Sequence, residues 1–139
     1  MSDCLFCKIA TKEIPSTMVY EDEDVYAFLD IHPVQPGHTL IVPKVHSEWL
    51  LDTDPEILKK LVVVGQRVAR AVLSGLGVEG CNFTQNNGAV AGQAIPHFHF
   101  HVIPRKAGDG FKVWHGMPYG SAEEAEEVAR KIRDACHSA

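Results

Sequence analysis

The sequence lacks the features typical of a membrane protein or of a protein that binds nucleic acid through charge. No stretch approaches the roughly 18 consecutive apolar residues that a membrane span needs, and the N-terminus has no charged segment followed by an apolar one. The net charge is −5, and the Lys and Arg residues are scattered rather than clustered. A broad electrostatic surface for nucleic acid is therefore not expected. We expect a cytoplasmic protein with neither a membrane nor a nucleic-acid partner.

Internal repeats, low-complexity tracts and linkers are also missing. The 139 residues are expected to form a single domain, 1–139, which is long enough for one core without covalent cross-links. The chain contains only four cysteines, Cys4, Cys7, Cys81 and Cys136. In a cytoplasmic setting, these are expected to be thiols or metal ligands rather than disulfides.

Extended segments bounded by turns predict a mostly antiparallel sheet of about five strands. Residues 18–20 and 25–29 flank an acidic turn and are expected to form a β-hairpin. Further strands are expected at residues 38–42, closed by Pro43, and at residues 81–85. Together with a histidine-containing strand and two main helices, this pattern predicts an α+β fold.

The two helices are predicted from their caps and from apolar spacing. Asp54 is expected as the N-cap of the first helix, with Pro55 at its first position and Gly75 at its end. Ser121 and Glu124 predict a capping box for the last helix. The residues of the first helix that recur at three- and four-residue spacing, and are expected to face the core, are Leu58, Leu61, Val62, Gly65, Ala69 and Val72.

The most informative segment is residues 97–103, which read His-Phe-His-Phe-His-Val-Ile. In an extended strand, residues two apart share one face at roughly 6.5 Å spacing, so three imidazoles would line one face and apolar side chains the other. Pro104 is expected to end this strand. A lone histidine on an apolar strand is usually a core residue, but three in register each need partners for two ring nitrogens. The row therefore predicts a functional site.

Three histidines on one strand are compatible with two kinds of chemistry. Three neutral imidazoles and a water molecule can form a catalytic zinc site. Alternatively, one neutral imidazole attacks phosphorus and forms a phosphoramidate that water later hydrolyses. The second route needs an acceptor for the other nitrogen of the nucleophile and donors around the phosphate. The loop before the strand supplies such groups at Asn86, Asn87, Gly88, Gly92 and Gln93. An ordinary polar turn is the alternative, but the position of the loop directly before the histidine strand favours a phosphate-binding role.

These segments together resemble the histidine-triad (HIT) family, and in particular its Hint branch. Residues 97–103 fit the signature His-φ-His-φ-His-φ-φ, and further matching segments occur in order at residues 6–9, 13–15, 20–22, 28–31, 36–44, 86–88 and 92–93. The resemblance implies a HIT-like α+β fold and an enzyme acting at α-phosphate bonds of nucleotides. It also implies a homodimer across which the sheet continues, with residues 111–118 reaching the partner subunit.

The resemblance further implies roles for individual residues. His99 would be the nucleophile that forms a nucleotidyl-histidine intermediate, and His101 would hydrogen-bond the phosphate or the leaving group. His97 and His38 would support the site. The expected nucleotide-binding residues are Asn86 and Gln93 at the phosphate, Asp30 at the ribose, and Leu5, Phe6, Ile9, Phe28 and Ile31 around the purine; Ile9 and Ile31 are equally well explained as core residues. Ala94 departs from the pattern, because many Hint proteins carry a serine there that hydrogen-bonds the leaving atom.

Cys4-Leu5-Phe6-Cys7 is the second informative group. A CxxC alone fits a redox pair, half of a zinc site or two unrelated thiols, and no βαβ context favours a thioredoxin-like role. A tetrahedral zinc site needs two more ligands. The resemblance implies a structural zinc held by Cys4, Cys7, His46 and His97, as in some bacterial members, with no metal needed for the chemical step.

The function expected from these observations is hydrolysis or transfer at the α-phosphate of purine nucleoside phosphoramidates or dinucleoside polyphosphates. Two rival functions stay open. One is a module that binds nucleotide in the same pocket with little turnover and works through protein partners. The other is a zinc-dependent hydrolase that uses the three histidines as metal ligands.

Overall fold

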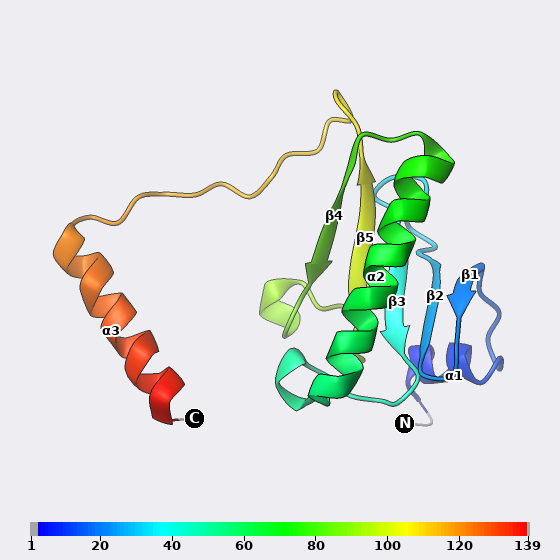
Figure 1. The fold of residues 1–139 in the computed structure, drawn as a ribbon, viewed down its shortest axis with the longest axis horizontal. Helices are drawn as coiled ribbons and strands as arrows, with labels where there is room; N and C mark the ends of the chain where they lie inside the picture. Colours follow the sequence, from blue (N-terminus) through cyan, green and yellow to red (C-terminus); the bar gives the residue numbers. More distant parts are fainter. Residues whose placement is uncertain (1–2, 139) are drawn as a thin grey trace. The chain divides into compact units, whose positions relative to one another are not determined.

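The computed structural model describes residues 3–138, which divide into two compact units, one ending at Asp109 and one beginning at Gly110 (Figure 1). The first unit contains a five-stranded antiparallel sheet with the order β1-β2-β3-β5-β4. Its elements are α1 (Leu5–Ala10), β1 (Met18–Glu21), β2 (Val25–Leu29), β3 (Thr39–Pro43), α2 (Pro55–Leu76), β4 (Gly80–Gln85) and β5 (Phe100–Arg105), with 3-10 turns at Leu50–Asp52 and Ala89–Ala91. The predicted α+β class and antiparallel sheet are confirmed, and the single domain over 1–139 stays a prediction.

The sheet is buried on both faces, because successive residues of β2 and β3 alternate between two apolar clusters. Helix α2 lies across one face (Figure 1), where its buried residues pack against Val25, Ala27 and Ile41. On the other face, Tyr26 and Phe28 belong to a second cluster; its full membership is Phe6, Ile9, Tyr26, Phe28, Leu40 and Val42. Helix α1 therefore lies on the face opposite α2.

Helix α2 begins as expected but ends later. The Asp54 carboxylate accepts a hydrogen bond from the Glu56 N–H at 2.8 Å. The prediction that Gly75 ends the helix was wrong: the C-cap is Gly77, whose φ of 65° is the left-handed conformation that glycine adopts easily. The prediction that Val62 faces the core was also wrong. Val62 is 50% exposed, because it follows Leu61 directly and its side chain therefore points away from the buried face of the helix. That face consists of Leu61, Val64, Gly65, Val68 and Val72.

Only the second half of the histidine segment lies in a paired strand, which starts later than predicted. β5 begins at Phe100, so His97 and His99 precede the paired strand. The prediction that Pro104 ends the strand was wrong, because Pro104 pairs with Cys81 inside it. β3 pairs with β5 only as far as Val102, so Pro104 has a neighbouring strand on one side alone and its missing N–H is tolerated.

The second unit contains helix α3 (Ala122–Ser138). The Glu124 N–H donates to Ser121 Oγ at 3.1 Å, as the predicted capping box requires. The Glu124 carboxylate accepts from the Gly120 N–H at 2.9 Å, one residue earlier than that motif places it. Within residues 3–138, no helix combines the length and the apolar character needed to cross a membrane.

Candidate active site and metal centre

The alternation predicted for the histidine segment places apolar and polar side chains on opposite faces. Phe98 and Val102 are fully buried in the cluster beneath α2. The three histidines lie on the other face, but they face three different environments. His97 lies beside two cysteines and His46, His101 lies beside His38, and the ring of His99 packs edge-on against the ring of Phe6, with centroids 5.1 Å apart.

The hydrogen bonding of His99 defines its tautomer. Its Nδ1 lies 2.7 Å from the backbone carbonyl oxygen of His97, and a carbonyl can only accept, so Nδ1 carries the proton. Burial lowers the pKa of His99 below its usual range, which keeps the ring neutral near pH 7. Nε2 therefore retains its lone pair. A neutral, oriented imidazole of this kind is suited to nucleophilic attack.

A chain of hydrogen bonds also defines the tautomer of His101. The backbone N–H of Val34 donates to His38 Nδ1 at 3.1 Å, so the proton of a neutral His38 lies on Nε2. His38 Nε2 then donates to His101 Nδ1 at 2.9 Å. Burial lowers the pKa of His38, and it lowers the pKa of His101 to about 4, so both rings are neutral near pH 7. His101 is left with an Nε2–H donor for a ligand.

Four side chains form a cluster with the composition of a zinc site. His97 Nε2 donates to the Pro43 carbonyl at 2.9 Å, which leaves the His97 Nδ1 lone pair directed at the cluster. Nδ1 lies 3.3 Å from Cys4 Sγ, 3.6 Å from Cys7 Sγ and 3.1 Å from His46 Nδ1. A tetrahedral zinc ion separates its nitrogen and sulfur ligands by roughly 3.3–3.8 Å. The residues therefore fit a closed Cys2His2 zinc site without an open position.

The three histidines of residues 97–101 do not converge on one metal position. Among the described residues, two groups of possible ligands each lie within 4.8 Å: the cluster Cys4, Cys7, His46 and His97, and a second group of Asp30, His38 and His101. His99 belongs to neither group. The geometry thus gives no support to a catalytic zinc held by all three histidines.

The two side-chain amides of Asn86 and Gln93, in the loop before β5, differ in their hydrogen bonding. The Asn86 side chain has no hydrogen-bond partner within the described part of the chain, although it lies beside Gly92. In contrast, Gln93 Oε1 accepts from the Gly88 N–H at 2.8 Å, and its Nε2 donates to the Glu48 and Ile95 carbonyls. Gln93 therefore shapes the loop, whereas Asn86 is available to a ligand.

The residues expected around a purine differ in burial. Phe6, Ile9 and Phe28 belong to the buried cluster on the histidine face, and the rings of Phe6 and Phe28 meet edge-on at 5.5 Å. Leu5 is 39% exposed and Ile31 is 84% exposed, so these two lie at the surface. Asp30 is part-buried; one carboxylate oxygen accepts from the His32 N–H at 2.8 Å, and the other lies 3.8 Å from His38 Nε2.

Two features of this site were not predicted from the sequence. The hydroxyl of Tyr26 donates to the backbone carbonyl of Phe6 and so ties α1 to the sheet. The carbonyl oxygens of Pro43 and His97 set the histidine tautomers. Backbone acceptors have no signature in the sequence, and only the burial of Tyr26 in an apolar strand hinted at its need for a partner.

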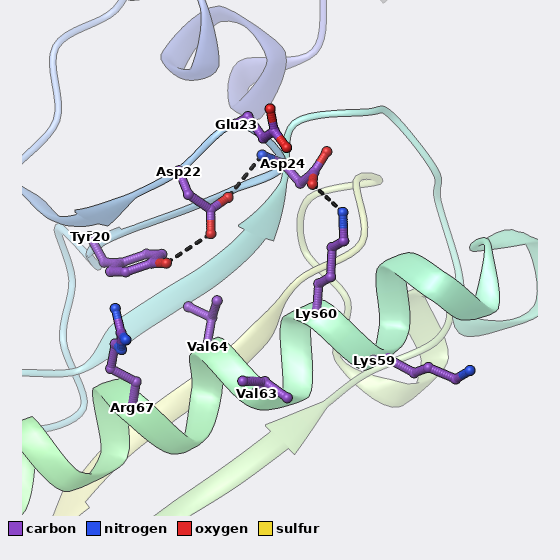
Figure 2. Close-up of a pocket in the computed structure, with 9 residues that line it drawn as sticks. All are labelled: Tyr20, Asp22, Glu23, Asp24, Lys59, Lys60, Val63, Val64 and Arg67. Carbon is purple, nitrogen blue, oxygen red and sulfur yellow. Dashed lines mark hydrogen bonds and ion pairs between the residues drawn. The ribbon is translucent and has the colours of Figure 1, made fainter.

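A cleft of about 470 Å³ lies between the β1–β2 turn and α2 (Figure 2). Its charged groups are largely satisfied within the cleft: Tyr20 donates to Asp22 at 2.8 Å, Lys60 pairs with Asp24, and the Arg67 guanidinium lies 5.5 Å from the Tyr20 ring centroid. Tyr20 packs against the apolar cluster beneath α2, on the face of the sheet away from the histidines. The cleft is therefore separate from the histidine site.

Comparisons with known proteins agree with this site. A family model described as the HIT domain matches residues 11–108. The chain belongs to the HIT family. This HIT protein is 50% identical over 130 residues to an uncharacterized HIT-like protein of Methanocaldococcus jannaschii, across 94% of the chain and 98% of the relative. It is 43% identical over 103 residues to an adenosine 5'-monophosphoramidase of Saccharomyces cerevisiae, across 74% of the chain and 63% of the relative.

A solved structure also bears on the metal centre. A Zn-bound histidine triad family protein from Mycobacterium smegmatis superimposes with a TM-score of 0.77 at 38% identity, across 99% of this HIT chain and 97% of that chain. The predicted resemblance to the HIT family is confirmed. The CxxC pair of this HIT protein fits the zinc-containing type.

Proposed function

We propose that this HIT protein is a nucleotide hydrolase or transferase that cleaves α-phosphate bonds of purine nucleoside phosphoramidates or dinucleoside polyphosphates. The proposal rests chiefly on the bond from His99 Nδ1–H to the His97 carbonyl, which leaves Nε2 as a neutral nucleophile. The similarity to a yeast adenosine 5'-monophosphoramidase supports the same class of substrate.

In the proposed reaction, His99 Nε2 attacks the α-phosphorus and forms a phosphorus–nitrogen bond. The leaving group departs with the electron pair of its own bond to phosphorus and takes up a proton. Water then attacks the phosphorus, breaks its bond to Nε2 and returns the lone pair to His99. The water gives up a proton in this step, which balances the one taken by the leaving group. The mononucleotide is released.

The Nε2–H of His101 would stabilise the charge that develops on a phosphate oxygen or on the leaving atom. Asn86 is proposed to contact phosphate, because its amide has no other partner among the described residues. Asp30 would accept from the ribose hydroxyls, and Phe6, Ile9 and Phe28 would line the purine side, with Leu5 and Ile31 at its rim. Gln93 would have to give up an internal hydrogen bond to touch phosphate through its side chain.

We propose zinc as the metal of the Cys4, Cys7, His46 and His97 cluster, in a structural role. Such an ion would tie α1 to the loop after β3 and to the segment before β5. It would add stability, because the four ligands are dispersed in the unfolded chain. The chemical step proposed above uses only side chains of the protein.

A homodimer is also proposed. β4 lies at the edge of the sheet, so its outer hydrogen-bonding groups can pair with a second copy. In the unit that begins at Gly110, Trp114 is 88% exposed and Val113 and Met117 are comparably exposed, as expected of side chains that meet a partner. Sedimentation of the full chain would show twice the chain mass if the proposal holds and the single-chain mass if it does not.

A panel of substrates tests the proposed activity. Wild type and His99→Asn would be incubated with adenosine and guanosine phosphoramidates, dinucleoside polyphosphates and sugar nucleotides, and the released mononucleotide measured. The proposal predicts turnover by the wild type of at least one class and loss of several orders of magnitude in the variant. Tight binding of adenosine monophosphate without turnover of any compound would favour a nucleotide-binding module instead.

A further inference from the structure

We infer that the Cys4, Cys7, His46 and His97 cluster acts as a positioning centre for His99. A zinc ion held there would fix the two segments of chain that orient the His99 ring, so the metal would affect the rate as well as stability. The inference rests on the proposed function in that His99 is taken as the nucleophile. It extends that function, because a metal site without an open coordination position would help to orient the nitrogen of His99 that reacts.

The first link runs through His97, which serves both sites. Its side-chain Nδ1 faces the cluster, within 3.1–3.6 Å of the other ligand atoms. Its backbone carbonyl accepts the 2.7 Å hydrogen bond from His99 Nδ1. One residue thus carries a metal-directed nitrogen and the acceptor that sets the tautomer of His99. A displacement of His97 moves that acceptor directly.

The second link runs through Phe6, which lies between the two cysteine ligands. The Phe6 ring meets the His99 ring at 88° with centroids 5.1 Å apart, and it also contacts the His97 ring at 5.8 Å. Helix α1 has only six residues, and its N-cap Cys4 makes no side-chain capping bond. An isolated helix needs roughly 12–15 residues to be even marginally stable in water. The position of α1, and hence of Phe6, depends on ties such as the cluster.

Both links constrain the His99 ring from different sides. The carbonyl of His97 holds Nδ1, and the Phe6 ring, nearly perpendicular to the His99 ring, limits its rotation. Misplacement of a reacting group by about 1 Å can lower a rate by about 100-fold. Zinc removal should therefore lower kcat by roughly 10- to 100-fold. KM should also rise, because Phe6 lines the proposed purine pocket and shifts with α1, whereas Asn86 and Asp30 contribute no ligand to the cluster and should keep their nucleotide contacts.

Proton exchange at His99 Nδ1 provides a readout that needs no substrate. In zinc-loaded protein labelled with ¹⁵N in its imidazoles, the His99 Nδ1–H should exchange slowly with solvent at a fixed neutral pH. After chelation, below the melting temperature of the metal-free protein, that exchange should accelerate at least tenfold while the amides of β2 and β3 keep their protection. Unchanged exchange and unchanged kcat in folded, metal-free protein would overturn the inference.

Two variants separate the links from a general loss of stability. Phe6→Leu keeps all four ligands, so it should retain one zinc per chain yet show faster Nδ1–H exchange at His99. Ile14→Val trims a residue packed on the same apolar cluster and should leave exchange at wild-type rates. Equal exchange in Phe6→Leu and wild type would overturn the second link. If no substrate is turned over, the proposed function fails, whereas the exchange comparison still decides the coupling.

Discussion

Acid should weaken this fold through the neutral pair formed by His38 and His101. Burial lowers the pKa of His101 to about 4, whereas an exposed histidine in the unfolded chain titrates near 6.5. Between these values, the unfolded chain binds more protons than the folded one, so the free energy of unfolding falls as pH falls. A difference of about 2.5 pKa units corresponds to at most about 3 kcal/mol, and because His101 is only part-buried we expect about 2 kcal/mol.

Urea unfolding of wild type and His101→Asn between pH 7 and pH 4 measures this effect. The charged or titratable groups that influence His101 are His38, His99 and Asp30, and all of them remain in the variant. His101→Asn should therefore lose about 2 kcal/mol less than wild type over this range. His115→Asn removes an exposed histidine from the other unit and should follow wild type. Identical pH dependence in wild type and His101→Asn would show that the burial of neutral His101 does not make the fold sensitive to acid.

Three further predictions concern the leaving group, the metal and the core. Ala94→Ser should raise kcat for substrates with a poor amine leaving group and barely change it for good leaving groups; equal effects on both would show that residue 94 does not face the leaving atom. Cys4→Ser or chelation should lower zinc content and melting temperature, while the folded fraction keeps roughly 1–10% of its kcat; Cys136→Ser is the control. Turnover that falls below detection in folded protein and returns with added zinc would instead indicate a catalytic metal. Gly65→Ala should destabilise the protein by about 1–3 kcal/mol, because the added Cβ would lie 2.5 Å from the Phe83 ring. Gly75→Ala lies in the same helix with nothing within 4 Å of its Cβ, and it should stabilise by up to about 1 kcal/mol in the same thermal melt; equal effects of the two substitutions would contradict the packing argument.

The sequence predicted the elements that local signals specify. Asp54 and Pro55 marked the start of α2, and the alternation of residues 97–103 placed aromatic and imidazole rings on opposite faces. The sequence predictions were wrong where the pairing of distant strands or the backbone conformation decides the structure. Pro104 continues β5 because β3 stops pairing earlier, and choosing between Gly75 and Gly77 as the helix end required the backbone conformation.

The candidate site was likewise predicted only in part. Residue types and their order were enough to select the histidines and the CxxC pair as candidates. The tautomers were not predictable, because they depend on the carbonyls of Pro43 and His97 and on the N–H of Val34. The internal use of the Gln93 amide was hidden for the same reason: its partners are backbone groups of Glu48, Gly88 and Ile95.

In the proposed mechanism, His99 Nε2 forms a covalent bond to the α-phosphorus. The most direct test is to quench wild-type protein during turnover of an adenosine phosphoramidate and to locate the adduct by mass spectrometry of peptides under mildly basic conditions, because a phosphorus–nitrogen bond to histidine is acid-labile. We expect a nucleotidyl group on the peptide that contains His99 and none in His99→Asn, which should still bind adenosine monophosphate. Rapid turnover by His99→Asn, or an adduct on another residue, would contradict this mechanism.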